Sequence, residues 1–351
     1  TGIVQEFQFG MNWSDYSRFV GDIFGAPLAI EALLAFFLES TFLGLWIFGW
    51  GRINEKVHLG AIWLVHIGTV LSAFFILAAN SFMQNPVGYT NNPVTGRAEL
   101  TDFVAVLTNK VQLVAFPHVI AAAWMSGGAF VLGIALWLMW RSQTPEGDLG
   151  MYRRSARLGA IILLLGGVAV TISGDLQSRV MTQVQPMKMA AAEALYDTSP
   201  EGKGASFSII SVGTPDGQHE TWAIRVPKLL SFLSTGTLDG RVEGINDLQA
   251  EYELAFSGNA LTEAANYRPI IPVTYWTFRW MIGTGMAAMA IGAFALWALR
   301  GDVRRLTSKR WLWTSLAVIL LPLLANSFGW IFTEMGRQPW LVFGVITTKM
   351  G

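Results

Sequence analysis

The chain has 351 residues, of which 52% are hydrophobic and only 14% are charged, and its formal net charge at pH 7 is zero. A soluble domain carries about 25% charged residues, so the composition excludes an ordinary soluble protein, and the neutral balance does not favour nucleic acid as a partner. Cysteine is absent, which excludes disulfides, thiolate haem ligation and cysteine-bound iron–sulfur clusters. We therefore expect an all-α integral membrane protein built as a transmembrane helix bundle.

Apolar spans follow one another along most of the chain, each near or above the roughly 20 residues that a helix needs to cross a bilayer. Six are complete and cover residues 24–50, 58–83, 115–140, 155–174, 271–299 and 311–332. The opening residues 1–4 lack an initiator Met and a signal-like region, and they resemble the tail of a further, partial span. Since the chain also stops soon after the sixth span, we expect a fragment of a longer protein. Three parts are predicted, namely residues 1–174 with the partial span and four complete ones, the polar segment 175–269, and residues 270–351 with the last two spans.

Basic residues predict the orientation of the bundle. They gather in three alternate loops, at Arg52 and Lys56, at Arg141, Arg153, Arg154 and Arg157, and at Arg300, Arg304, Arg305, Lys309 and Arg310. Loops rich in Lys and Arg stay in the cytoplasm. The segment 175–269 and the end of the sixth span are therefore expected on the extracytoplasmic side.

Two carboxylates, Glu31 and Glu39, lie within the first complete span. An ionisable group at membrane depth is expensive and is a functional-site hypothesis by default. In an unbroken α-helix the two would be about 80° apart around the axis and ~12 Å apart along it, too far to chelate one ion together. Desolvation lets a carboxyl carry a proton near neutral pH, so the pair could serve one proton path at two depths. The alternative for each is a structural hydrogen bond to a neighbouring helix.

One histidine and one methionine lie in the outer halves of two spans. His118 is about one turn into the third span, and Met281 is roughly three turns into the fifth. An imidazole and a thioether on facing helices can be the two axial ligands of a haem iron, and Arg279 could neutralise a haem propionate. Either residue alone is more often a packing residue. His58 and His66 are interpreted as packing or interfacial residues.

The outer segment 175–269 is too long to be a plain connection and is expected to bind something or to act as a lid. It opens with an amphipathic helical stretch at 187–195 that contains Lys188 and Glu193, and turn signals follow at 199–202 and 215–217. A poorly ordered insertion is the alternative. Lys188 and Glu193 could simply be solvated, and His219, beside acidic and polar neighbours, is expected to be solvated.

The sixth span ends in a carboxylate and an arginine one helical turn apart, Glu334 and Arg337, with Trp330 one turn earlier. One interpretation is an ion pair at a helix end. The other is that Glu334 faces a metal centre, Arg337 holds a propionate or substrate anion, and Trp330 stacks on a macrocycle.

Several motifs along nearly the whole chain are similar to those of a known family. They are EFQFG at 6–10, NW at 12–13, GDIFGAPLAIE at 21–31, FFLESTF at 36–42, MQNP at 83–86 and GRQPW at 336–340. With them the chain resembles subunit I of the cytochrome bd-type quinol:oxygen oxidases, in the variant with the shorter quinol loop. The resemblance departs in two places, because the family's first span, which supplies a histidine ligand for a high-spin haem, and its last span are not present.

The resemblance implies cofactors and site residues. The cofactors are a low-spin haem b, a high-spin haem b and haem d. His118 and Met281 match the ligands of the low-spin haem, and Glu334 matches the ligand of the high-spin haem b. The remaining matches are to carboxylates beside the haem d site and its proton supply (Glu31, Glu39), to the quinol-oxidising loop (Lys188, Glu193) and to residues that flank the haems (Arg279, Trp330, Arg337).

The function implied is that of a multi-pass protein of the bacterial cytoplasmic membrane. It would oxidise ubiquinol or menaquinol at the outer face and reduce oxygen to water with protons taken from the inside. A second large subunit and one or more small single-span subunits are the implied partners. The rival hypothesis is a proton-coupled transporter that uses Glu31, Glu39 and Glu334 as a relay without haem. A non-catalytic assembly subunit is the third.

Overall fold

The computed structural model describes residues 7, 11–141, 145–200, 202–214, 218–300, 306 and 308–351. Six helices in it are long and apolar enough to cross a membrane, and they confirm the six predicted spans. Some of the predicted features lie outside the described residues, namely the partial span at 1–4, most of the motif at 6–10, the turn at 215–217, Glu201 of the turn at 199–202, and Arg304 and Arg305.

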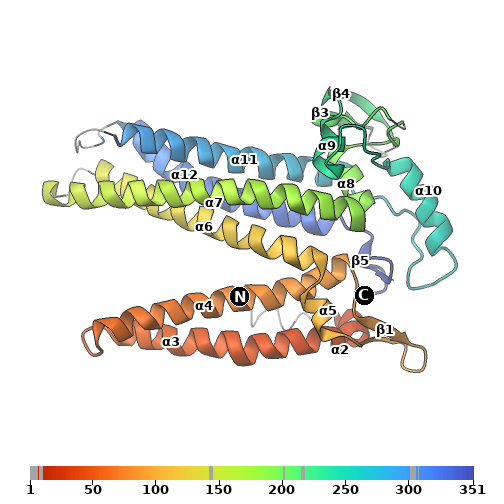
Figure 1. Cartoon of the computed structure of the whole chain (residues 1–351), viewed down its shortest axis with the longest axis horizontal. Helices are drawn as coiled ribbons and strands as arrows, with labels where there is room; N and C mark the ends of the chain where they lie inside the picture. The colour runs from red at the N-terminus through yellow and green to blue at the C-terminus, as the bar shows by residue number, and fades with distance from the viewer. Residues whose placement is uncertain are drawn as a thin grey trace. The chain divides into compact units, whose positions relative to one another are not determined.

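The elements are predominantly helical (Figure 1). The helices are α2 (Ser14–Ile30), η1 (Glu31–Phe36), α3 (Phe37–Phe48), α4 (Glu55–Gln84), α5 (Phe103–Leu107), α6 (Lys110–Trp140), η2 (Glu146–Asp148), α7 (Leu149–Val184), α8 (Pro186–Glu193), α9 (Leu229–Thr235), α10 (Ile245–Phe256), α11 (Ile271–Ala298) and α12 (Lys309–Met335). The strands form three antiparallel pairs, β1 (Tyr89–Asn92) with β2 (Arg97–Leu100), β3 (Phe207–Gly213) with β4 (Glu220–Val226), and β5 (Trp340–Val342) with β6 (Ile346–Thr347).

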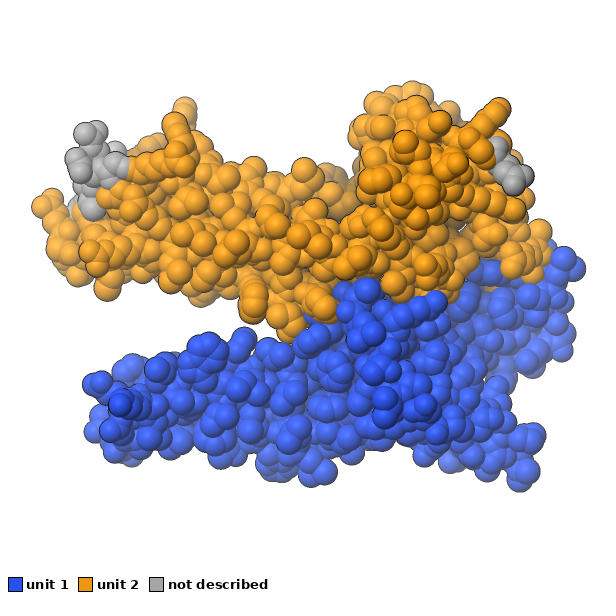
Figure 2. Space-filling model, in the orientation of Figure 1, with its two compact units in different colours: residues 1–116, 252–266, 339–351 blue, residues 117–251, 267–338 orange. Residues whose placement is uncertain are grey.

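The chain packs as two compact units (Figure 2). The first comprises Thr1–Phe116, Tyr252–Asn266 and Pro339–Gly351, and the second comprises Pro117–Glu251 and Tyr267–Gln338. These units follow packing, whereas the three predicted parts follow the membrane spans, and that division stays a prediction.

A π-helical turn interrupts the first span. The backbone over Glu31–Phe36 is a π-helix between two α-helical stretches, so the angle of 80° expected between Glu31 and Glu39 from an unbroken α-helix does not apply. Single π-helical turns inside α-helices are rare and frequent at functional sites. Gly68 of α4 packs beside the end of this turn, where an added Cβ would lie 3.1 Å from the carbonyl oxygen of Ala35 and 3.2 Å from the amide nitrogen of Glu39.

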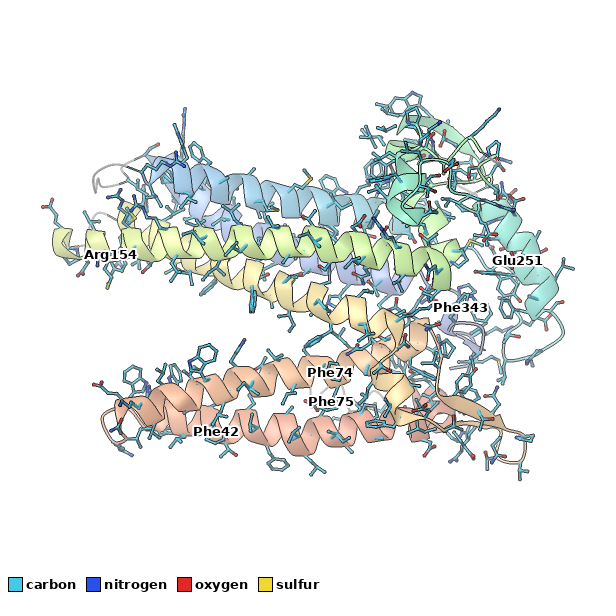
Figure 3. The ribbon with its side chains drawn as sticks, viewed as in Figure 1. Phe42, Phe74, Phe75, Arg154, Glu251 and Phe343 are labelled. Carbon is cyan, nitrogen blue, oxygen red and sulfur yellow. The ribbon has the colours of Figure 1, made fainter. Side chains whose placement is uncertain are left out.

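The second unit is a bundle of α6, α7, α11 and α12 with a buried apolar core. Figure 3 shows Arg154 at one end of α7, whereas Glu251 on α10 lies towards the other end. The segment after α7 therefore folds at the end of the bundle opposite to the basic loop. Helix α7 continues to Val184, so the first ten residues of the predicted polar segment belong to it.

Glycine lets α6 and α7 approach closely. A Cβ on Gly159 would lie 2.6 Å from the backbone nitrogen of Leu132 and 2.7 Å from the carbonyl oxygen of Gly128. Small residues at helix interfaces allow this backbone contact in membranes, where packing replaces the hydrophobic effect as the driving force.

Replacing Gly159 by alanine is expected to destabilise the protein by roughly 1–3 kcal/mol, because backbone atoms must move apart. Gly150, on the same helix, has no atom within 4 Å of an added Cβ. Gly150→Ala is therefore the matched control and should be neutral or slightly stabilising, since alanine favours helix by about 1 kcal/mol. Thermal unfolding of both purified variants measures the difference, and equal midpoints would contradict the packing argument.

The polar segment after α7 is folded, not a poorly ordered insertion, in the residues that the structure describes. Its first element, α8, was predicted to be amphipathic, and that prediction is wrong, because every residue from Met187 to Glu193 is buried. The helix is enclosed by contacts with α7 and α11. Lys188 and Glu193, only 3% and 2% exposed, are therefore not solvated.

Candidate functional site

His118 is held by a serine on the neighbouring helix of the second unit. Its Nδ1 lies 3.1 Å from Oγ of Ser173 on α7. The Ser173 hydroxyl has a single proton, which it donates to the carbonyl oxygen of Ala169 at 2.7 Å. It therefore accepts from His118 Nδ1–H, which leaves Nε2 with its lone pair free for a metal. Gly174 adds to the fit, since a Cβ there would lie 3.5 Å from Cε1 of the ring.

Replacing Ser173 by alanine is expected to weaken haem binding at His118 by roughly 10–100-fold, the usual cost of losing the partner that orients a ligand histidine. The prediction applies if His118 is a haem ligand. Titration of haem into the apoprotein and the midpoint potential of the low-spin haem measure the effect. Ser173→Thr, which keeps the hydroxyl, is the rescue variant, and a Ser173→Ala protein with unchanged binding and potential would contradict the role.

Met281 on α11 faces α12. A Cβ on Gly329 would lie 3.0 Å from the Met281 sulfur, so a larger residue there would require the thioether to shift. Two residues earlier, the Arg279 side chain is only 11% exposed and its guanidinium stacks near the rings of Phe207, Tyr275 and Phe278. Its Nε and Nη1 atoms are buried without a hydrogen-bond partner among the described residues. Unsatisfied buried donors call for an explanation, and an anion such as a haem propionate is one group that they could bind.

A buried acid–base network joins Glu193 to α11. Arg279 Nη2 donates to Glu193 Oε2 at 2.7 Å and to the carbonyl oxygen of Ser208 at 2.6 Å. The backbone amide of Ser208 also donates to Glu193 Oε2, and its hydroxyl lies 2.9 Å from the Tyr275 hydroxyl. Burial raises the pKa of Glu193, and the neighbouring Arg279 only partly offsets this effect. The carboxyl can therefore take up and release a proton at higher pH than an exposed glutamate.

Lys188 lies against the end of α12 and not beside Glu193. A Cβ added to Gly336 would lie 2.9 Å from the Cγ atom of Lys188, so the two residues are in contact. The Nζ atom of Lys188 lies 5.5 Å from the ring centroid of Phe332. Burial lowers the pKa of Lys188 to about 7, although the carboxylate of Glu334 acts in the opposite direction. The structure thus brings Lys188 to Glu334 and Arg337, an association that spacing in the sequence does not reveal.

Glu334 and Arg337 form the ion pair that was one of their two interpretations. Arg337 Nε donates to Glu334 Oε2 at 3.0 Å, and Nη2 contacts the same oxygen. Arg337 is buried, whereas Glu334 is about one-third exposed and Trp330 is 46% exposed. The exposed surface of the Glu334 carboxylate and of the Trp330 ring leaves both able to meet a further group.

In the first unit, the Ser72 hydroxyl of α4 donates to Glu31 Oε1 at 2.7 Å. The alternative of a structural hydrogen bond is therefore observed for Glu31. For Glu39 no hydrogen-bond partner is found within the described part of the chain. The two carboxylates thus differ in their hydrogen bonding, and their place on one proton path stays a prediction.

The other three histidines take no part in the contacts described above. His58 packs between Trp46 and Trp50 and its Nε2 lies 2.9 Å from the carbonyl oxygen of Trp46, which suits an interfacial residue. His66 and His219 are exposed. Sequence reasoning missed four residues whose hydroxyls hydrogen-bond to the candidate site residues or to each other, namely Ser72, Ser173, Ser208 and Tyr275. In the sequence they are marked only as hydroxyl residues within or beside an apolar span.

The fold and the site define a class, namely polytopic helical membrane proteins with buried ionisable side chains. The family model for cytochrome bd terminal oxidase subunit I matches residues 1–351, and the chain belongs to this family. Relatives include subunit 1 of the cytochrome bd ubiquinol oxidase of Bacillus subtilis, 45% identical over 349 residues (99% of this chain and 71% of the relative). Subunit 1 of the cytochrome bd-II ubiquinol oxidase of Escherichia coli is 36% identical over 402 residues, covering 99% and 76% of the two chains. The structure of the bd oxidase from Geobacillus thermodenitrificans is similar with a TM-score of 0.79 and 26% identity, over 99% of this chain and 77% of the other.

The family assignment makes this chain a multi-pass bacterial membrane protein and a subunit of a terminal oxidase. It therefore decides against the haem-free transporter and the assembly subunit.

Proposed function

We propose that this chain oxidises quinol at its α8 and β3 region and carries haem in its helix bundle, as part of a quinol:oxygen oxidoreductase. The observation that supports this most is the buried network of Glu193, Arg279 and Ser208, because it joins an acid with a raised pKa to the α11 turn that leads to Met281. A proton acceptor next to a redox ligand is what quinol oxidation needs, since each quinol gives up two electrons and two protons.

The residues fit a haem. His118 keeps Nε2 available because Ser173 holds Nδ1, and Met281 offers a thioether against Gly329. Arg279 retains buried N–H groups without a partner among the described residues, which suits a propionate. A bound haem supplies reversible one-electron transfer, while the protein sets its potential and its distance to the substrate. The proposed haem set is a low-spin haem b at His118 and Met281, a high-spin haem b at Glu334 and a haem d.

In the quinol step, the Glu193 carboxylate accepts one proton from a quinol hydroxyl. Arg279 and the Ser208 amide hold that carboxylate in place through hydrogen bonds at 2.7 Å and 3.2 Å. Burial lowers the pKa of Lys188 to about 7, so this side chain is assigned to bind the quinol head group or take its other proton. Arg337 holds Glu334 by hydrogen bonds to one oxygen, and the exposed Trp330 ring would pack beside a haem held there.

Protons for oxygen reduction travel from the cytoplasmic side through Glu39 and then Glu31. Ser72 fixes Glu31, and the π-helical turn sets where the two carboxylates point. The α8 to α10 segment lies on the extracytoplasmic side by the distribution of basic loops. Proton release and uptake on opposite sides then separate charge without a pump.

The proposed partners are a second large membrane subunit and one or more small single-span subunits. The substrate is ubiquinol or menaquinol, and the names of the relatives include both kinds of oxidase. This chemistry places the complex in the bacterial cytoplasmic membrane.

A reduced-minus-oxidised visible spectrum of the purified complex, together with quinol-driven oxygen uptake, tests the proposal. We expect b-type haem bands, a far-red chlorin band and oxygen uptake that requires quinol. A protein without haem bands and without quinol-dependent oxygen uptake would overturn the proposal.

A further inference from the structure

An exposed apolar sheet face covers one side of the β3–β4 hairpin in the second unit. Its members are large aliphatic or aromatic side chains that are more than one-third exposed, Ile209, Ile210, Val212, Trp222, Ile224 and Val226. Trp222 and Ile224 are 54% and 45% exposed. A contiguous exposed patch of this kind marks an interaction surface. We call these six residues the hairpin face.

The strand register explains why the apolar side chains gather on one face. Ile210 pairs with Ile224 and Val212 pairs with Trp222, so these four project together. An irregularity between Ser208 and Ile210 adds Ile209 to β3 as an extra residue. Because of it, both Ser208 and Ser211 turn to the opposite, buried face, where Ser208 meets Tyr275.

The buried face fixes the hairpin to a membrane-spanning helix at a defined depth. Ser208 contacts Tyr275 through its hydroxyl and Arg279 through its carbonyl oxygen. These partners lie four and eight residues into α11, or about 6 and 12 Å along the helix from its first residue. The start of β3 is therefore level with the outer turns of a transmembrane helix and not above them.

The same level of α11 carries exposed tryptophans. Trp276 and Trp280 are 38% and 54% exposed, in the position of an aromatic belt at the membrane interface. Figure 1 shows β3 and β4 standing to the side of α11, away from α7, and Figure 2 shows the same part as a bulge on the flank of the second unit. The hairpin thus stands beside the exposed apolar side chains of α11, and Val212 of the hairpin face and Trp276 of α11 line the same hollow.

From this depth and this position beside α11, we infer that the hairpin face binds the outer leaflet of the bilayer. The hairpin face would contact the lipid where the head groups meet the acyl chains. Trp222 would lie at the same depth as Trp276 and Trp280. The ion pair between Arg225 and Glu220 lies on the opposite face of the hairpin, where Arg225 donates to the carbonyl oxygen of Ala194 and Ser211 donates to Glu220. The hairpin anchors the segment that contains Glu193 against the membrane, from which lipophilic molecules approach.

Spin labels on single cysteines test this inference directly, because the natural chain has none. The variants Ile224→Cys and Val212→Cys report on the hairpin face, Met286→Cys on the apolar middle of α11, and Glu251→Cys on the exposed surface of α10. The whole complex is placed in vesicles of phosphatidylethanolamine and phosphatidylglycerol, and collision rates with oxygen and with a water-soluble nickel chelate are measured. The unsubstituted complex gives the background from its other subunits.

We expect the ratio of oxygen to nickel collisions at residues 212 and 224 to be several-fold higher than at residue 251 and to approach that at residue 286. A ratio equal to that at residue 251 would mean that the hairpin face lies in water and would overturn the inference. Exclusion of both reagents at residues 212 and 224 would mean that a protein subunit covers the face, which would overturn it as well.

Discussion

Replacing Met281 by leucine is expected to abolish the low-spin haem band and quinol-driven oxygen uptake. Leucine has nearly the same volume as methionine, so packing against Gly329 is preserved while the thioether is lost. If Met281 holds the haem as proposed, its loss should exceed the roughly 10–100-fold effect of removing a partner that merely orients a ligand. The reduced-minus-oxidised spectrum and the rate of oxygen uptake measure the change.

Met286 provides a matched control on the same helix. It is 65% exposed and lies more than a turn further along α11. Met286→Leu should leave the spectrum and the uptake unchanged. If both variants retained the low-spin band, Met281 would be a packing residue and its assignment as a haem ligand would be wrong.

Replacing Glu193 by glutamine is expected to lower quinol oxidation by roughly 10²–10⁴-fold, the range that general acid–base catalysis contributes. Glutamine keeps the size and can still accept from Arg279 Nη2, but it cannot take a proton. The haem spectrum should remain intact, which separates this variant from Met281→Leu. Glu251→Gln, on the exposed surface of α10, is the control and should retain full activity.

The pH profile gives this prediction a second measurement. The ionised form of Glu193 is the proton acceptor, and burial raises its pKa above the usual 4.5. Activity of the natural protein should therefore fall on acidification at a higher pH than an exposed carboxylate would cause, and it should recover as the pH rises. The residual activity of Glu193→Gln should lack this acidic limb. A variant that keeps both the limb and the rate would remove Glu193 from the proton step.

The same raised pKa has a consequence for stability. The folded state binds the Glu193 proton more tightly than the unfolded state does, so between the usual pKa of 4.5 and the raised value the folded protein holds more protons. Stability from this group is therefore present below that window and is lost as the pH rises through it.

The sequence by itself determined the six spans and the class of the protein. Within a bilayer the backbone N–H and C=O groups of a single span must form hydrogen bonds within that span. A long apolar run is therefore helical. Specific motifs such as GRQPW at 336–340 were local too, and the family assignment could be made from them. Candidate residues such as His118 and Glu31 stood out because polar groups are rare in such runs.

Only the tertiary structure decided which of these residues meet. Glu193 and Arg279 are 86 positions apart, and Ser173 reaches His118 from another helix, so no local spacing predicts either contact. The burial of Lys188 arises because α7 and α11 enclose α8, although the sequence of that helix looks amphipathic. The π-helical turn at Glu31–Phe36 likewise lies in an ordinary apolar run, next to the close approach that Gly68 permits. Burial and long-range hydrogen bonds depend on how helices pack, and these contacts, unlike the spans, are properties of the assembled fold.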